Sequence, residues 1–337
     1  MRNNPISASV DFNKDGVQHG HLRLPYSRND SAWGSILIPI AVIRNGAGPV
    51  ALLTGANHGD EYEGPLALVS LASELAAEEI RGTVIIVPFF NQPAFAAGAR
   101  VSPIDQGNMN RAFPGQPDGT PTQKIADYFQ RVLLPMADIV LDFHSGGRTL
   151  DFLPFAASHI LEDKAQAARC RAARDAFNAP FSIEMREIDA LGMYDEAAEA
   201  LGKTFVTTEL GGGGTSRPDT VAIARKGARN LLIHAGILRA APEAAPSRHL
   251  TQPDDECFHF ASTGGLIEFT VTLGEAVASG DVLARIWPTG RTGLPPQTLY
   301  AQRAGLLVAR HHPGLVQPGD CLAVLAVEIA APVATDQ

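Results

Sequence analysis

The sequence predicts an α/β protein followed by a small all-β unit, and three observations support this prediction. Between residues 35 and 236, short apolar or β-branched runs alternate with segments of helical spacing, as in parallel strands joined by helical crossovers. Several of these runs are almost continuously apolar, which is typical of strands covered on both faces. After residue 249, glycine and proline divide the sequence into short strand-like pieces.

The α/β part contains five predicted strands, at residues 36–43, 50–54, 83–88, 139–143 and 204–209. Helical spacing marks three further segments, one around Leu68 and two at residues 165–177 and 221–237. Strands and helices in this order predict a sizeable sheet with helices packed against it.

Two domains are expected, because 337 residues exceed what one hydrophobic core usually organises. An Ala- and Pro-rich segment at 240–246 is typical of a linker, so we predict an α/β domain over 1–240 and a β domain over 249–330. In the second, residues 277–284 are echoed by 316–323, which predicts a tight turn between two strands in each half. The repeat resembles biotinyl and lipoyl carrier barrels, but no acceptor lysine follows Lys226, so a structural or substrate-covering role is expected.

Composition excludes several classes of protein. A net charge of -9 without a dense Lys/Arg cluster argues against a nucleic-acid partner. No apolar stretch approaches the roughly 20 residues of a membrane span, and the polar N-terminus lacks the core of a signal peptide, so a cytoplasmic location is expected. Three widely spaced cysteines suggest neither disulfides nor a Cys-rich metal site, so any metal must bind histidines and carboxylates.

A candidate metal site lies at the carboxyl edge of the predicted sheet. Residues 54–61 leave an apolar strand and enter a predicted helix, and in a helical turn His58 and Glu61, three residues apart, share a face. His144 follows a second apolar strand and falls at the same edge. Alone, the His-x-x-Glu pair is more often a helix start with ordinary surface side chains. With His144 it becomes a set of three ligands that suits zinc and leaves a position for water, the arrangement of catalytic zinc.

Asp142 precedes His144 by two residues, so strand alternation places both side chains on one side. Two roles are open for it. Asp142 either accepts the second N–H group of His144 or of another ligand, as carboxylates near metals commonly do, or caps the following turn.

These residues carry a family resemblance. His58-x-x-Glu61, the distant His144 and the string NMNRAFPG at 108–115 resemble the succinylglutamate desuccinylase and aspartoacylase family of the zinc carboxypeptidase superfamily. The resemblance covers roughly residues 50–214, and segments 57–61 and 142–147 look closest to the deacetylases of N-acetyl-diaminobutyrate in ectoine degradation. It implies a zinc-carboxypeptidase-like mixed, largely parallel sheet, a C-terminal barrel-sandwich and one Zn²⁺ per subunit.

The resemblance also implies roles for four more residues. Asn110 and Arg111 match the pair that binds the substrate's α-carboxylate, and Arg100 matches the arginine that polarises the scissile carbonyl; guanidinium groups suit both tasks. Glu209, at the end of a predicted strand, matches the glutamate that takes a proton from water and protonates the leaving amine. Taken singly, the arginines would be surface residues and Glu209 a solvated strand end. Together they imply hydrolysis of a small N-acyl amino acid.

Alternatives remain open at this point. An aspartoacylase-like or desuccinylase-like enzyme needs a cationic pocket for a second carboxylate, whereas a diaminobutyrate enzyme needs an anionic one. Four acidic residues near predicted loops allow the anionic pocket, namely Asp105, Asp151, Asp195 and Glu196. A non-catalytic zinc or small-molecule binding protein is the other alternative, and a homo-oligomer is expected by family analogy alone.

Overall fold

The structure is a computed structural model that describes residues 4–185 and 191–330. The first part contains, in chain order, β1 (Ser7–Ala8), β2 (Gly16–Pro25), β3 (Ser35–Asn45), β4 (Val50–Thr54), α1 (Glu63–Glu74), η1 (Ala77–Glu79), β5 (Gly82–Val87), α2 (Gln92–Ala97), η2 (Met109–Arg111), α3 (Pro121–Tyr128), η3 (Phe129–Leu133), α4 (Leu134–Met136), β6 (Ile139–Asp142), β7 (Leu150–Phe152), β8 (Phe155–His159), α5 (Lys164–Phe177), β9 (Phe181–Met185), α6 (Tyr194–Glu199), β10 (Thr204–Glu209) and α7 (Pro218–His234). The second contains β11 (Arg248–Thr251), η4 (Asp255–Cys257), β12 (Phe258–Phe260), β13 (Gly265–Phe269), β14 (Ala276–Val277), β15 (Val282–Trp287), β16 (Gln297–Tyr300), β17 (Gly305–His311), β18 (Leu315–Val316) and β19 (Cys321–Ile329).

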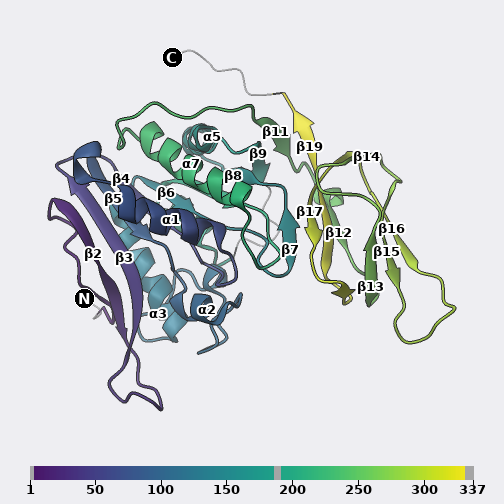
Figure 1. Cartoon of the computed structure of the whole chain (residues 1–337), viewed down its shortest axis with the longest axis horizontal. Coiled ribbons are helices and arrows are strands. Elements are labelled where there is room, and N and C mark those ends of the chain that lie inside the picture. Colours follow the sequence, from purple (N-terminus) through teal and green to yellow (C-terminus); the bar gives the residue numbers. More distant parts are fainter. Residues whose placement is uncertain (1–3, 186–190, 331–337) are drawn as a thin grey trace.

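Among the described residues, one sheet of 15 strands runs through both parts in the order β1-β2-β3-β5-β4-β6-β10-β8-β9-β11-β19-β17-β14, with β12 and β7 attached to β19 and β17. Figure 1 shows it passing from the helix-rich part into the C-terminal strands. Pairing is parallel from β5 through β4 and β6 to β10, and again from β8 through β9 to β11. It is antiparallel elsewhere, so the sheet is mixed.

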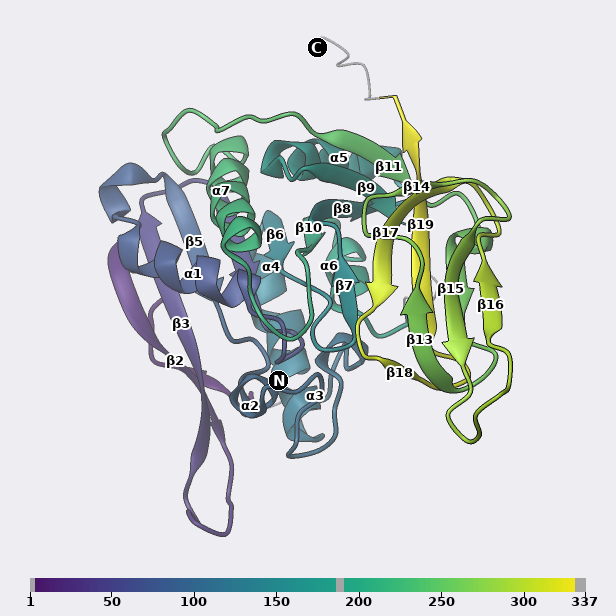
Figure 2. The same cartoon turned by 45° about the vertical axis from the view of Figure 1, so that its right-hand side comes forward.

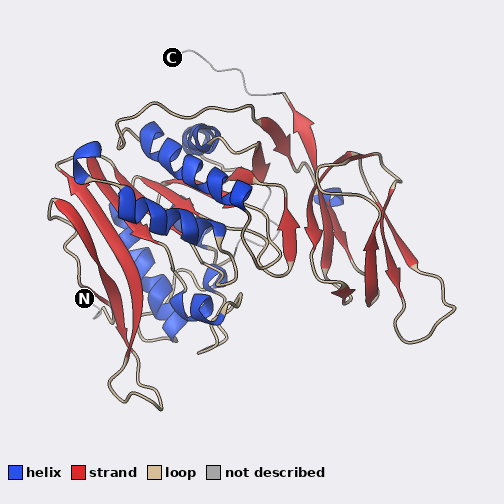
Figure 3. Cartoon of the chain, in the orientation of Figure 1, coloured by secondary structure: helices blue, strands red, loops and turns tan. Residues whose placement is uncertain are grey.

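Helices cover both faces of the N-terminal part of this sheet, as Figure 3 shows. On one face, α1, α5 and α7 bury Leu68, Phe177 and Leu231 against β3 to β6 and β10. On the other, α3, η3, α4 and α6 bury Phe129 and Tyr194 against the same strands and β2. Burial on both faces explains why the central strands are apolar throughout.

All five predicted strands are confirmed, as β3, β4, β5, β6 and β10, with ends that differ by at most two residues. The helices around Leu68 and near 165–177 and 221–237 are confirmed as α1, α5 and α7. Strand β3 departs from the expected parallel pattern because it pairs antiparallel with β5. Strands β2, β8 and β9 were missed: the first half of β2 is partly exposed and mostly polar, and β8 (FAASH) and β9 (FSIEM) lack the continuous apolar runs of β4 and β6.

The register of the central strands brings three strand ends together. Thr54 of β4 pairs with Asp142 of β6, which pairs in turn with Thr207 of β10. Parallel strands end at the same edge of a sheet, so the loops after these three strands meet there. This edge positions every candidate ligand predicted from the sequence.

The C-terminal strands form two layers. The four-stranded sheet β16-β15-β13-β18 faces β17 and β19 of the large sheet (Figure 2), and Leu283, Leu307 and Leu325 pack between them. Both halves of the predicted repeat are confirmed as strand-turn-strand units, β14 to β15 and β18 to β19. Their turns place Gly280 and Gly319 at φ angles of 91° and 94°, which glycine adopts without strain. In residues 4–185 and 191–330, no helix combines the length and apolar character of a membrane span.

Candidate metal and substrate site

His58 and Glu61 lie on the loop that follows β4. They precede Glu63, the first residue of α1, so the expected helical turn is wrong at this point; the chain instead makes a tight turn that buries both side chains to 3% exposure. Gly59, between them, packs directly on α2: a Cβ there would lie 2.0 Å from the carbonyl carbon of Ala94. The loop therefore needs glycine at this position to bring the two side chains inward.

His144 follows β6 at the same edge, and β10 fixes its backbone. Its N–H donates to Thr208 Oγ1 at 3.2 Å, and its carbonyl accepts from Thr208 Oγ1 at 3.2 Å and from the Leu210 N–H at 3.1 Å. The side chain is 10% exposed. Because both its backbone N–H and its carbonyl bond to the end of β10, His144 has a fixed position relative to the sheet.

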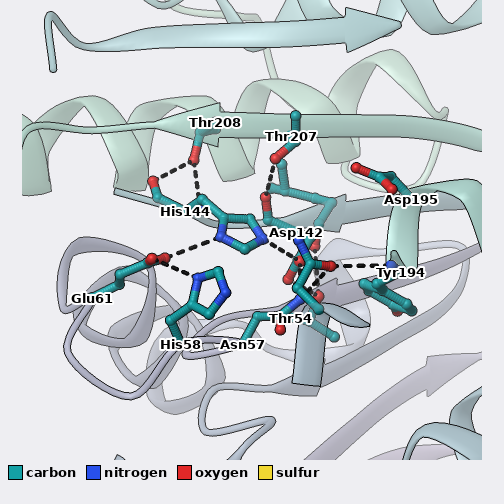
Figure 4. Close-up of polar contacts among 12 residues, drawn as sticks. Thr54, Asn57, His58, Glu61, Asp142, His144, Tyr194, Asp195, Thr207 and Thr208 are labelled. Carbon is teal, nitrogen blue, oxygen red and sulfur yellow. Dashed lines mark hydrogen bonds and ion pairs between the residues drawn. The ribbon is translucent and has the colours of Figure 1, made fainter. Parts of the chain in front are cut away.

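The three predicted ligands converge, as Figure 4 shows. Glu61 Oε1 lies 2.7 Å from His58 Nδ1, and Glu61 Oε2 lies 3.1 Å from His144 Nδ1. One ligand atom from each residue falls within 4.8 Å of the other two, and His58 Nε2 is buried without a hydrogen-bond partner among the described residues. Two imidazoles and a carboxylate at this spacing can hold a metal ion, and the donor set suits zinc.

Asp142 adjoins this cluster and accepts three hydrogen bonds. Its Oδ2 accepts from His144 Nε2 at 2.8 Å and from Asn57 Nδ2 at 2.9 Å, and its Oδ1 accepts from Thr54 Oγ1 at 2.6 Å. Because Asp142 holds the proton on Nε2, Nδ1 is the ring nitrogen of His144 that remains for a metal ion, once the proton it shares with Glu61 is displaced. This geometry corresponds to the first of the two roles open for Asp142 and not to a turn cap.

Two of the three ligands, His58 and Glu61, are already in the protonation state that metal binding requires. Burial lowers the pKa of His58, assisted by the charges of Arg100 and His144, which favours a neutral ring. Although burial acts in the opposite direction, His58 and His144 lower the pKa of Glu61, so it is ionised. For His144, the carboxylates of Asp142 and Glu61 outweigh burial and raise the pKa well above its usual value, so a metal ion would have to displace a proton there.

A pocket opens beside the three ligands and contains the other predicted site residues except Asp142. It is lined by His58, Glu61, Arg100, Asn110, Arg111, His144, Ser145, Gly146, Leu150, Phe152, His159, Met185, Met193, Asp195, Phe205, Thr207 and Glu209. The structure therefore brings together residues spread over more than 150 positions of the sequence.

Arg100, Asn110 and Arg111 enter the pocket from the side of α2 and η2. Arg100 is 45% exposed, with Nη1 3.8 Å from Glu61 Oε1. Asn110 is buried, and its Oδ1 accepts from the Tyr194 N–H at 3.0 Å and from Asn57 Nδ2 at 3.3 Å. Arg111 is exposed and donates from Nη1 to the Asn110 carbonyl at 2.7 Å. Two cationic groups and an amide thus face one side of the metal ligands.

Glu209 ends β10 and lines the same pocket. Its Oε2 is buried and has no hydrogen-bond partner among the described residues. Burial, followed by the negative charge of Glu61, raises its pKa to about 8 in the metal-free protein. A carboxyl group in this state can both accept and release a proton near neutral pH.

Sequence reasoning missed several residues of the site. Thr54, Asn57 and Thr208 position the ligands or Asp142, and their proximity to the predicted ligands in the sequence was the available signal. His159 was missed because its strand, β8, was not predicted. Of the four acidic candidates, only Asp195 lines the pocket; Asp105 accepts from Thr122, Asp151 pairs with Arg217 and Arg310, and Glu196 is exposed.

Comparisons with known proteins agree with this architecture. The catalytic-domain profile of the succinylglutamate desuccinylase/aspartoacylase family matches residues 47–235. The chain is 53% identical to the N-alpha-acetyl-L-2,4-diaminobutyric acid deacetylase of Halomonas elongata, over 97% of this chain and 96% of the relative.

Two solved structures are also similar to this chain along almost its whole length. The product-bound structure of the ectoine utilization protein EutE (DoeB) from Ruegeria pomeroyi is 62% identical, with a TM-score of 0.96 over 97% of this chain and all of that one. A crystal structure from a Silicibacter species, described as a succinylglutamate desuccinylase, is 60% identical, with a TM-score of 0.95 over 98% of this chain and all of that one. The chain belongs to the succinylglutamate desuccinylase/aspartoacylase family.

Proposed function

We propose that the protein is a zinc-dependent amide hydrolase that converts N2-acetyl-L-2,4-diaminobutyrate to acetate and L-2,4-diaminobutyrate in ectoine catabolism. The observation that carries the proposal is the convergence of His58, Glu61 and His144 beside Glu209 in one pocket. The choice of substrate is supported by the name of the Halomonas relative, since 53% identity spans almost the whole of both chains.

His58, Glu61 and His144 would hold one Zn²⁺ per subunit, with Asp142 orienting His144. Zinc bound there supplies Lewis acidity to the scissile carbonyl and lowers the pKa of a bound water to about 7. Both the donor types and the buried position of the three side chains support this choice of metal. Residues 1–240 would form the zinc-carboxypeptidase-like catalytic unit, and residues 249–330 a barrel-sandwich domain.

The other pocket residues handle charge and protons. Glu209 would accept the proton of the attacking water and deliver it to the α-amine as the amide bond breaks. Burial raises its pKa in the metal-free protein, and the positive charge of bound zinc would lower that pKa again, which favours the carboxylate that accepts the proton. The Arg100 guanidinium would stabilise the oxyanion that develops on the carbonyl. Because Asn110 Oδ1 already accepts two internal hydrogen bonds, its amide N–H group is the part left to donate to the substrate's α-carboxylate, beside Arg111.

One specific observation favours a second candidate within the same chemistry. The Silicibacter structure, 60% identical to this chain, is described as a succinylglutamate desuccinylase. Such a substrate has a second carboxylate on the side chain of its amino acid, besides the α-carboxylate, and this second group would meet the acidic residues of the pocket. Like charges in a partly buried pocket disfavour binding, so the deacetylase is the better-supported assignment.

Steady-state assays of the purified protein test the proposal. N2-acetyl-L-2,4-diaminobutyrate should be hydrolysed with kcat/KM at least tenfold higher than N-acetyl-L-aspartate or N2-succinyl-L-glutamate. Chelation should abolish the activity, and Zn²⁺ should restore it. Comparable turnover of N-acetyl-aspartate would remove the substrate assignment. No hydrolysis of any acylated amino acid by the zinc-loaded protein would favour a non-catalytic binding protein.

A further inference from the structure

The pocket extends along β10 away from the metal ligands. Side chains alternate along a strand, so Glu209, Thr207 and Phe205 face the same side, and all three line the pocket. Thr207 and Phe205 lie two and four residues before Glu209, so they continue the pocket along the strand. The pocket therefore has a near end beside the metal ligands and a far end beside Phe205.

The far end carries its own polar groups. His159 ends β8 and stacks on Phe205, with ring centroids 6.4 Å apart and planes at 22°. Asp195, in the first turn of α6, places Oδ2 3.7 Å from His159 Nε2, while Glu199 Oε1 lies 2.8 Å from His159 Nδ1. In Figure 4, Asp195 lies on the opposite side of Asp142 from Glu61.

Among the described residues, three carboxylates line the pocket, and two of them already have tasks. Glu61 belongs to the metal cluster, and Glu209 is the proposed proton carrier. We propose that the third, Asp195, recognises the side-chain ammonium of the substrate and thereby sets the specificity of the enzyme. This inference rests on the proposed function, since it assigns the part of the same pocket that holds the substrate's side chain.

The burial of Asp195 supports this assignment. Asp195 is 7% exposed, so an ammonium group that reaches it leaves bulk water and requires a counter-charge. A carboxylate supplies that charge together with a charge-assisted hydrogen bond. A substrate with a carboxylate in its side chain would instead meet a like charge at this point, which disfavours it.

The position of Asp195 is also tied to the site proposed for the α-carboxylate. The N–H of the preceding residue, Tyr194, donates to Asn110 Oδ1 at 3.0 Å. Tyr194 is itself fully buried, with its ring within 6.1 Å of the rings of Phe90, Phe113, Phe129 and Phe205. The separation between the two charge-binding groups is therefore fixed, so the pocket selects for the length of the side chain as well as for its charge.

The test compares Asp195→Asn with Glu196→Gln, on a charged and a neutral substrate. Glu196 is the adjacent acidic residue in the first turn of α6 and is exposed, so its variant makes the same charge change outside the pocket. N-acetyl-L-norvaline replaces the ammonium of N2-acetyl-L-2,4-diaminobutyrate with a methyl group of similar size.

We expect Asp195→Asn to lower kcat/KM for the diaminobutyrate substrate on the order of 100-fold, mainly through KM, because the contact exists before and during the reaction. Turnover of acetyl-norvaline should stay within about threefold, and Glu196→Gln should resemble the wild type on both. An equal loss on both substrates would mean that Asp195 only supports α6 and Asn110. That result, or no loss on either substrate, would overturn the inference.

Calorimetric binding of L-2,4-diaminobutyrate separates this inference from the proposed function. If the wild type hydrolyses neither substrate, the proposed function fails. Tight binding to the wild type with a loss of about 100-fold in Asp195→Asn would then still support the inference. Equal binding by both proteins would overturn it.

Discussion

The two ends of the pocket are built differently. At the near end, His58, Glu61 and His144 come from loops that directly follow two neighbouring parallel strands, and hydrogen bonds with Asp142 and Thr208 fix His144. At the far end, the polar groups come from β8 and α6. Strand β8 pairs antiparallel with β10, and α6 packs against the sheet. In our proposal, the near end supplies chemistry common to many amide substrates, whereas the far end distinguishes one substrate from another.

The largest effect expected is at Glu209. Glu209→Gln keeps the size of the side chain but cannot carry the proton, so kcat should fall by roughly 1000-fold to 10,000-fold. Being a near-end change, it should reduce turnover of charged and neutral substrates equally and leave the zinc content unchanged. Glu184→Gln, on strand β9 of the same sheet, where Glu184 pairs with Arg171, is the control. Unchanged turnover in Glu209→Gln would contradict the role given to this residue.

Removing the Arg100 guanidinium should have the next largest effect. Arg100→Ala deletes a cation beside the developing oxyanion, so kcat should fall by about 100-fold to 1000-fold with little change in KM. The side chain is 45% exposed, and thermal unfolding should shift little. Arg23→Ala, which removes an exposed arginine on β2, serves as the matched variant. A rise in KM at constant kcat would instead assign Arg100 to substrate binding.

Asp142→Asn should weaken metal binding by about tenfold to 100-fold. Asp142 accepts from Thr54, Asn57 and His144, and an amide nitrogen in place of one oxygen would face a donor. Competition with a chromogenic chelator measures the affinity for zinc. If Asp142→Asn binds zinc as tightly as the wild type does, the second N–H of His144 does not need this partner.

The smallest effect expected is a pH dependence of stability in the metal-free protein. Burial raises the pKa of Glu209 from about 4.5 to about 8, so the folded chain retains a proton that the unfolded chain has released in between. The free energy of unfolding should therefore decrease as pH rises through this window. In Glu209→Gln the decrease should be smaller. Urea unfolding at pH 5 and pH 8 measures the decrease. If the free energy of unfolding changes equally between the two pH values in both proteins, the pKa of Glu209 is not raised.

The same contrast explains what the sequence could predict. Buried parallel strands have continuous apolar runs, so β4 and β6 were recognisable, and their following loops carried His58, Glu61 and His144. The turn before α1 was mistaken for helix because spacing alone does not distinguish the two. The far end could not be predicted, since β8 (FAASH) contains no β-branched residue and its pairing with β10 depends on the tertiary fold. Asp195 remained one of four acidic candidates until the pocket was defined.

Zinc analysis of two histidine variants tests the central claim most directly. His144 and His159 line the same pocket, at its near and far ends, and only His144 belongs to the proposed ligand set. We predict about one zinc ion per chain in the wild type and in His159→Ala, and less than about a tenth of that in His144→Ala, with hydrolysis lost in parallel. Wild-type zinc content in His144→Ala, or a wild-type protein that is active without zinc, would contradict the account.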